Sequence, residues 1–167
     1  MPFALTEDHR ALAEVAAALL ADRKVLAAAR DALDTPTEGL PPFWSAIAEL
    51  GWLGLHLPES HGGQGYGLAE LAVVVEAMGA VVAPGPFLPT VVAAALVDRR
   101  GVDDDRAALL PGLADGSTAA AVGLHGTVEL VDGFARGDAA RRRRRAGAAL
   151  PRAPATIWWS SSGRPSR

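Results

Sequence analysis

Apolar residues recur every three to four positions through the first two thirds of the chain, which is the spacing of an amphipathic helix. After Thr6, a good N-cap residue, the larger members of this pattern are Leu12, Val15, Leu19, Leu26 and Leu33. The pattern predicts one long helix over about residues 6–33. Further helices are predicted over about residues 43–50, 68–78, 87–100 and 103–114, with a glycine close after each of the first two and Gly116 after the last.

The pattern changes after residue 116. Residues 118–124 and 127–131 have the composition of strands, and the intervening His125-Gly126 suits a hairpin-like turn. Beyond Phe134 no period of 2 or 3.6 continues. We therefore predict a mainly α protein: a helical domain over residues 1–116, the start of a middle β domain over 117–135, and an Arg-rich, disordered or out-of-frame tail over 136–167.

An uncharged stretch from Ala77 to Val97 is long enough, by length alone, to span a membrane. Pro84, Pro86 and Pro89 interrupt it, so we predict two shorter helices joined by a turn and no membrane span. The first residues lack the basic and apolar regions of a signal peptide, and the chain has no cysteine. The expected localisation is the cytoplasm, and a disulfide framework is excluded.

Charge divides the chain into two unlike parts. The formal net charge is -3, but residues 1–135 hold 18 acidic and 7 basic residues, for -11, and residues 136–167 hold 9 arginines and Asp138, for +8. One explanation of the run Arg141 to Arg145 is a shifted reading frame in a GC-rich gene. Repeated CGT codons encode arginine in one frame and valine or serine in the other two. Binding of nucleic acid by the arginines, with Trp158 and Trp159 stacking on bases, is an alternative, but the acidic body favours no nucleic-acid partner.

Two motifs resemble functional sites, but their sequence context favours a structural role for each. Gly63-x-Gly65-x-Gly67 precedes a helix, as a phosphate-binding loop does, but no strand precedes it, so a turn with positive φ angles is the better interpretation. His56, Glu59 and His61 lie close together, but their spacing is not that of a zinc motif and Pro58 prevents a shared helix face. We predict no metal site, and no nucleophile-base motif is present.

The segment Phe43-Trp44-x-x-Ile47-Ala48-Glu49-Leu50-Gly51-Trp52-Leu53-Gly54-Leu55 and its continuation Leu57-Pro58-Glu59-x-x-Gly62-Gly63-x-Gly65 carry a specific resemblance. They are similar to the acyl-CoA dehydrogenase family. Residues 70–83 and the stretch Leu109-Leu110-Pro111-x-Leu113-Ala114-x-Gly116 resemble later elements of the same family. The likeness covers about residues 3–133. The turn Ala83-Pro84-Gly85-Pro86-Phe87 resembles a divergent branch with heteromeric members.

The resemblance implies a flavoprotein oxidoreductase of lipid metabolism that uses FAD for the α,β-dehydrogenation of acyl-CoA thioesters. The family has an N-terminal helical domain, a middle β domain and a C-terminal helical bundle, assembled as homo- or hetero-oligomers. The bundle normally supplies the catalytic glutamate, and no residue here matches it, so no catalytic residue is assigned. As candidates for the wall of the acyl-CoA pocket we name Phe87, Leu88, Val91 and Val92, for which a place in the core is equally expected.

The resemblance also implies what this sequence lacks. The Thr-Glu-Pro-like element that contacts the flavin is not recognisable at residues 124–131, so no cofactor-binding residue is assigned. We expect a truncated chain that is inactive alone and does not hold FAD by itself. The alternative is a non-catalytic helical subunit, or interaction module, that pairs with another dehydrogenase subunit.

Overall fold

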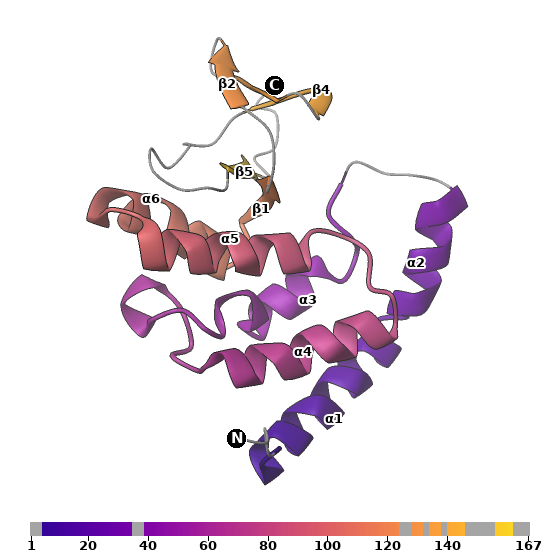
Figure 1. Ribbon diagram of the computed structural model, residues 1–167. Coiled ribbons are helices and arrows are strands. Elements are labelled where there is room, and N and C mark those ends of the chain that lie inside the picture. Colours follow the sequence, from indigo (N-terminus) through magenta and orange to yellow (C-terminus); the bar gives the residue numbers. More distant parts are fainter. Residues whose placement is uncertain are drawn as a thin grey trace.

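The structure, a computed structural model, describes the backbone of residues 5–34, 39–123, 128–131, 134–137, 140–145 and 156–161, and side chains up to residue 122. Six α-helices lie in the described part: α1 (Glu7–Asp22), α2 (Val25–Asp34), α3 (Trp44–Glu49), α4 (Leu68–Ala80), α5 (Phe87–Arg100) and α6 (Asp103–Ala114). Two short 3-10 turns, η1 (Trp52–Gly54) and η2 (Glu59–His61), follow α3. Figure 1 shows α4 and α5 stacked across the body, with α1 beside α4 and α6 beside α5. The prediction of a mainly α fold is confirmed.

The first predicted helix is two helices, so the expectation of one helix over residues 6–33 is wrong. The chain breaks at Lys24, whose φ of 52° lies in the left-handed region and stops the helix without a glycine or proline. Leu20 and Val25 are both buried in one core cluster. In an uninterrupted helix they would point about 140° apart, so the break allows both to face the core.

The other four predicted helices are confirmed, with α5 and α6 spanning the expected residues. Gly51 ends the α3 segment with a φ of 70°, as the sequence indicated. Gly79, in contrast, lies inside α4, which continues to Ala80. A glycine near the end of a helical pattern therefore marks the boundary only to within a residue or two.

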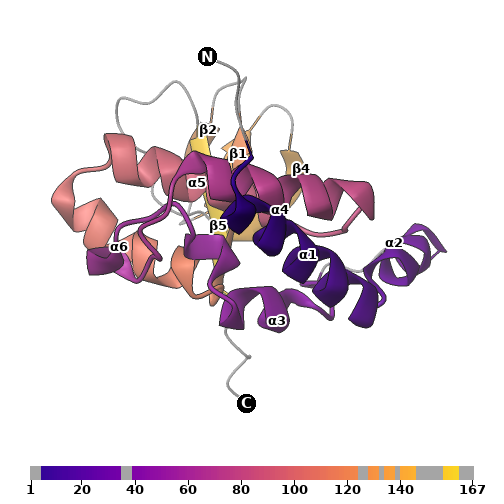
Figure 2. The same ribbon diagram turned by 90° about the horizontal axis from the view of Figure 1, so that it is seen from below.

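The core has two parts that share α5. One part lies between α1, α3, α4 and α5, and its larger fully buried side chains are Leu20, Val25, Ile47, Leu53, Val74 and Val91. The other lies between α5, α6 and the first strand, and includes Leu57, Val97, Leu110 and Leu113. Figure 2, seen from below, shows α5 and α4 crossing the middle of the body and α2 extending from one side.

The uncharged stretch folds as predicted into two helices with a turn between them. α4 ends at Ala80 and α5 begins at Phe87. Gly85, with a φ of 102°, closes the turn so tightly that a Cβ there would lie 2.8 Å from the Pro41 ring. None of the described helices has both the length and the apolar character needed to cross a membrane.

Strand β1 (Thr118–Gly123) is attached to the helical body by two buried side chains. The Trp44 indole N–H donates to the Gly116 carbonyl at 2.9 Å, just before the strand. The Thr90 hydroxyl of α5 accepts from the Ala120 N–H at 3.1 Å and donates to the Ala120 carbonyl at 3.4 Å. These bonds hold β1 against the helices that precede it.

The strands form two separate antiparallel sheets. β1 pairs with β5 (Thr156–Ser161), and β2 (Val128–Val131), β3 (Phe134–Gly137) and β4 (Ala140–Arg145) form the other sheet in that order. The predicted hairpin between 118–124 and 127–131 is therefore wrong, although both strands exist; the residues of its turn lie outside those described. The physical reason is that Thr90 and β5 already occupy the two edges of β1.

The C-terminal segment differs in part from the expectation of disorder, because β4 and β5 lie within residues 136–167. Backbone pairing needs only N–H and C=O groups and no apolar period, so a periodicity argument does not detect it. The rest of that segment lies outside the described residues. The out-of-frame origin and the domain boundaries at residues 116 and 135 stay predictions.

Candidate functional site

The four candidate pocket residues on α5 separate into two pairs. Phe87 and Val91 are buried, 4% and 1% exposed, in the core between α3 and α4. Leu88 and Val92 are 53% and 39% exposed. Residues four apart lie on one face of a helix, so each pair shares a face, and only Leu88 and Val92 face a space that a ligand or another domain could fill.

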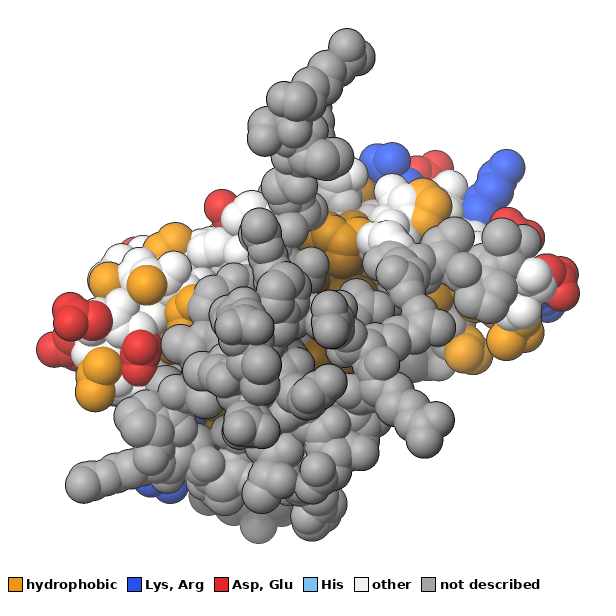
Figure 3. Space-filling view, turned by 90° about the horizontal axis from the view of Figure 1, so that it is seen from above, with side chains coloured by type: hydrophobic (Ala, Val, Ile, Leu, Met, Phe, Trp, Pro, Cys, Tyr) orange, Lys and Arg blue, Asp and Glu red, His pale blue; other side chains and the backbone are white. Residues whose placement is uncertain are grey.

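Helix α5 carries apolar residues on its exposed face as well as its buried face. Pro86 precedes the helix and Pro89 lies in its first turn, where a missing N–H costs little. Among the side chains coloured in the view from the strand side, hydrophobic ones lie near the middle of the face and also toward both ends, where acidic ones lie too (Figure 3). A helix that is apolar on most sides is typical of one that is covered on most sides.

The glycine loop uses its own backbone amides. The N–H groups of residues 62 to 66 all donate to main-chain carbonyls of residues 54 to 59, at 2.9 to 3.0 Å. Gly62 and Gly65 have φ angles of 82° and 70°, and a Cβ on Gly63 would lie 2.1 Å from the Leu57 carbonyl oxygen. The interpretation as a structural turn is confirmed, because the amides that would hold a phosphate are already bonded.

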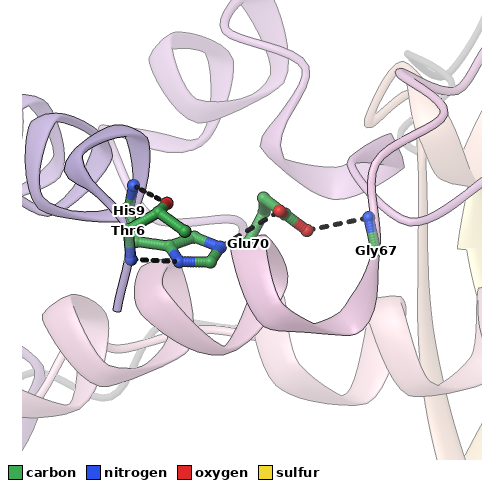
Figure 4. A network of polar contacts seen from close by, with 4 residues as sticks. All are labelled: Thr6, His9, Gly67 and Glu70. Carbon is green, nitrogen blue, oxygen red and sulfur yellow. Dashed lines mark hydrogen bonds and ion pairs between the residues drawn. The ribbon is translucent and has the colours of Figure 1, made fainter. Parts of the chain in front are cut away.

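A polar network joins the beginnings of α1 and α4 (Figure 4). Thr6 and His9 cap each other: the His9 N–H donates to the Thr6 hydroxyl at 3.2 Å, and the Thr6 N–H donates to His9 Nδ1 at 3.1 Å. His9 Nε2 lies 3.1 Å from Glu70 Oε1, and Glu70 Oε2 accepts from the Gly67 N–H at 2.8 Å. We call these four residues the helix clasp.

The contacts of the helix clasp define its protonation. Because His9 Nδ1 accepts a hydrogen bond, the ring carries its proton on Nε2 and donates to Glu70. The pKa of the Glu70 carboxyl is lowered by hydrogen bonds from its own N–H, from His9 and from Gly67. Every one of these contacts caps a helix or joins two helices, so the clasp is structural.

His56 presents a different case. Both of its ring nitrogens are buried and have no hydrogen-bond partner within normal geometry. Burial lowers the pKa of the imidazole, and the negative charge of Asp98 and the Val91 carbonyl only partly oppose this effect. His56 is therefore neutral at pH 7. Among the residues with described side chains, no three His, Asp or Glu residues gather as metal ligands, His56, Glu59 and His61 included.

Comparisons with known proteins show which family the chain belongs to. A family model for the N-terminal domain of acyl-CoA dehydrogenases matches residues 6–117. The chain belongs to the acyl-CoA dehydrogenase family. The matched residues are those of the helical body, so the resemblance seen in the sequence is confirmed.

Relatives within the acyl-CoA dehydrogenase family match part of this chain. Acyl-CoA dehydrogenase FadE12 of Mycobacterium tuberculosis is 42% identical over 79 residues, which is 45% of this chain and 20% of the relative. The structure of the Tcur3481-Tcur3483 steroid ACAD variant has a TM-score of 0.60 at 37% identity, covering 68% of this chain and 31% of that one. The ChsE4-ChsE5 complex from Mycobacterium tuberculosis gives 0.63 at 26% identity, covering 71% and 33%. The chain thus spans about a fifth of that curated relative.

Acyl-CoA dehydrogenases bind FAD, and a structure from Bacillus anthracis with the same fold (TM-score 0.55, 23% identity) is a complex with it. The glycine loop and Arg106 of this chain do not fit that cofactor. A flavin pyrophosphate needs free amides or converging cations, but the loop amides are used and Arg106 is paired with Asp103 and the Asp98 carbonyl. No cofactor-binding residue is assigned in the described part of the chain.

The helix clasp was not predicted from the sequence, because the sequence pattern indicated no partner for His9. The signal was present in the spacing of Thr6 with His9 and of Gly67 with Glu70, each three residues apart at the start of a helix. Spacing alone does not reveal that the two caps meet. His125, the other histidine without an assigned partner, lies outside the described residues.

Proposed function

We propose that this chain forms the helical part of a flavin-dependent acyl-CoA dehydrogenase that catalyses the α,β-dehydrogenation of an acyl-CoA thioester. The observation that carries the proposal is the family match over residues 6–117, which includes the whole of α5. The unpartnered apolar pair Leu88 and Val92 supports it, because acyl chains bind to apolar walls with few polar groups.

In this proposal the four α5 residues have two roles. Leu88 and Val92 contact the acyl chain of the substrate. Phe87 and Val91 lie on a neighbouring face of the helix, about 100° away, in one core cluster with buried side chains of α3 and α4, and keep the exposed pair in place. The side chains nearest the substrate are thus positioned by close packing, which is more precise than positioning by a loop.

The reaction removes a proton from Cα and a hydride from Cβ of the acyl group, which leaves a double bond between them. FAD, when bound, supplies the hydride acceptor. The described residues provide neither the base nor the flavin site, so both come from other parts of the complete enzyme. The part assigned to this chain is to bind the acyl group and exclude water from it.

The test is purification of the chain from the cells that produce it, followed by an absorption spectrum and dye-linked oxidation of acyl-CoA thioesters. Bound flavin together with oxidation supports the proposal. Straight-chain thioesters and thioesters with a steroid side chain should both be assayed, because the Tcur3481-Tcur3483 relative is a steroid ACAD. A preparation that stays colourless and inactive, with or without co-purified protein, would contradict a catalytic assembly.

Two matched variants test whether Leu88 lines the acyl-chain pocket. Leu88→Gln should raise KM severalfold with little change in kcat, because Leu88 contacts the acyl chain in both the ground state and the transition state. Leu26→Gln is the matched control: Leu26 is 43% exposed, close to the 53% of Leu88, but lies on α2. Equal effects of the two changes would count against a pocket wall on α5.

A second candidate is a non-catalytic helical subunit that pairs with another dehydrogenase subunit. It is favoured by two structural relatives, the Tcur3481-Tcur3483 steroid ACAD variant and the ChsE4-ChsE5 complex, because each is named for two proteins. The same purification separates the two candidates. Oxidation by the purified assembly with a KM that Leu88→Gln raises supports the first candidate. Fixed-proportion co-purification with a flavin-containing dehydrogenase subunit whose KM that variant leaves unchanged supports the second.

A further inference from the structure

Four residues of α5 lie in one line along its exposed face. They follow each other at intervals of four, three and four, which is the spacing of one side of a helix: Leu88, Val92, Ala95 and Arg99. Ala95 is half-buried and the other three are exposed. The line is therefore apolar over its first three members and ends on a cation.

The other sides of α5 are covered by the described body. Phe87 and Val91 pack in one core cluster with α3 and α4. Thr90 bonds to β1, and Val97 packs in the cluster that contains α6. A molecule that contacts α5 can thus reach it most readily along the line that ends at Arg99.

The two arginines in the last turn of α5 are adjacent in the chain but face different sides. Arg99 continues the line, and Arg100 lies about 100° away from it around the helix. Neither forms an ion pair with another described side chain, whereas Arg106 pairs with Asp103. A cation in the last turn is favoured by the helix dipole, but this effect is the same for both arginines and does not explain why one extends the apolar line.

We propose that Arg99 binds the phosphate groups of a coenzyme A thioester whose acyl chain lies along Leu88 and Val92. The inference rests on the proposed function and adds the direction of the substrate, with the acyl chain toward the start of α5 and the nucleotide toward its end. Arginine suits this role because its guanidinium can donate two parallel N–H groups to phosphate oxygens.

The length of the substrate agrees with the spacing along the helix. Val92 lies about 10.5 Å from Arg99 along the helix axis, and Leu88 lies about 16.5 Å from it. The pantetheine arm, between the thioester and the first phosphate, is about as long as four extended residues, roughly 14 Å. With the acyl group beside Leu88 and Val92, the arm passes Ala95 and the arginine side chain reaches the phosphates.

The test measures the binding of octanoyl-CoA and octanoyl-pantetheine to the full chain, purified with any subunits that accompany it in the cell. Arg99→Gln should raise the Kd of octanoyl-CoA about threefold to fivefold at low ionic strength, the worth of one exposed contact between opposite charges. It should leave octanoyl-pantetheine unaffected, because that ligand has no phosphate. Added salt should reduce the difference by screening.

Arg100→Gln is the matched control, because it removes the same charge from the same turn on another side of the helix. It should bind both thioesters as wild type does. Equal effects of the two changes, or an equal loss of both thioesters with Arg99→Gln, would overturn the proposal. If Leu88→Gln weakens both thioesters and Arg99→Gln changes neither, this inference fails and the pocket wall stands. If the wild type binds neither thioester, both fail.

The diphosphate of FAD has the same chemistry as that of coenzyme A, so the flavin content separates these two sources of phosphate. Arg99→Gln should leave the amount of bound flavin unchanged while it weakens the binding of octanoyl-CoA. A loss of flavin with no change in the Kd of octanoyl-CoA would assign Arg99 to the cofactor and overturn the proposal.

Discussion

Helices α5 and α2 are both rich in alanine and begin with large apolar residues, but their surroundings differ. α5 buries six residues along its length: Phe87, Thr90, Val91, Ala93, Ala94 and Val97. α2 buries one, Val25, and leaves Leu26 and Leu33 exposed at 43% and 82%. In Figures 1 and 2, α5 lies within the body and α2 extends from it. The comparison teaches that a helical pattern predicts a helix and not how much of it is covered.

The difference has an energetic meaning. A helix packed on several sides is stabilised by burial, while one of ten residues attached at a single end gains little from packing and is marginal by its intrinsic propensity. α5 should therefore open only with the whole body. α2 should open locally, at a much smaller free-energy cost.

Removing the first buried side chain of α5 should have the largest effect. Phe87→Ala deletes an aromatic ring that is 4% exposed and leaves a cavity against α3 and α4. We expect a loss of about 3–5 kcal/mol in the free energy of unfolding. Urea titration followed by circular dichroism measures it. A loss below about 1 kcal/mol would mean that α5 is not the centre of the core.

The second largest loss of stability is expected from a change at Trp44 of α3. Trp44→Phe keeps an aromatic ring but removes the buried indole N–H, so the Gly116 carbonyl loses its donor. An unsatisfied buried group costs about 1–3 kcal/mol, and the same titration should show this loss. If the variant is as stable as wild type, the beginning of β1 is held by packing and not by this hydrogen bond.

A smaller, pH-dependent effect should come from His56, beside α5. The lowered pKa of the folded protein means that below the ordinary value of 6.5 the unfolded chain binds a proton and the folded protein does not. Stability should thus fall as the pH drops below 6.5, down to the folded pKa, and should be unaffected above it. In His56→Gln this part of the slope should disappear. A slope that is the same in both proteins would contradict the assignment to His56.

The smallest effect is expected on α2. Leu33→Lys places a charge on a side chain that is already 82% exposed, so the free energy of unfolding should change by less than about 0.5 kcal/mol. The control is Val25→Ala, at the one buried position of the same helix. A large loss with Leu33→Lys would show that a second surface covers α2 and would remove the contrast with α5.

The sequence predicts well the elements whose ends are marked by residues that start or stop a helix. α5 and α6 have the expected bounds because prolines precede the first and three aspartates begin the second. The break at Lys24 was not predictable, because lysine is not a residue that favours a positive φ, and long-range burial of Val25 supports the break. The pairing of β1 was also missed, because the strand contacts a threonine of α5 and a segment over thirty residues later, and local pattern describes neither.

The candidate pocket wall on α5 was also only partly predictable from the sequence. The period of a helix predicts that Phe87 and Val91 share a face and that Leu88 and Val92 share another. Which of the two faces is buried depends on α3 and α4, so the sequence left all four as candidates. The structure separates them, and only the exposed pair stays in the proposed pocket wall.

The helix clasp has an electrostatic consequence. α1 and α4 begin side by side, so the positive ends of two helix dipoles are close together, with the Glu70 carboxylate between Gly67 and His9. A single anion thus serves as counter-charge to two helices. A cation at position 70 would be repelled by both ends at once, and this position should tolerate a change of charge less well than its partly exposed surface suggests.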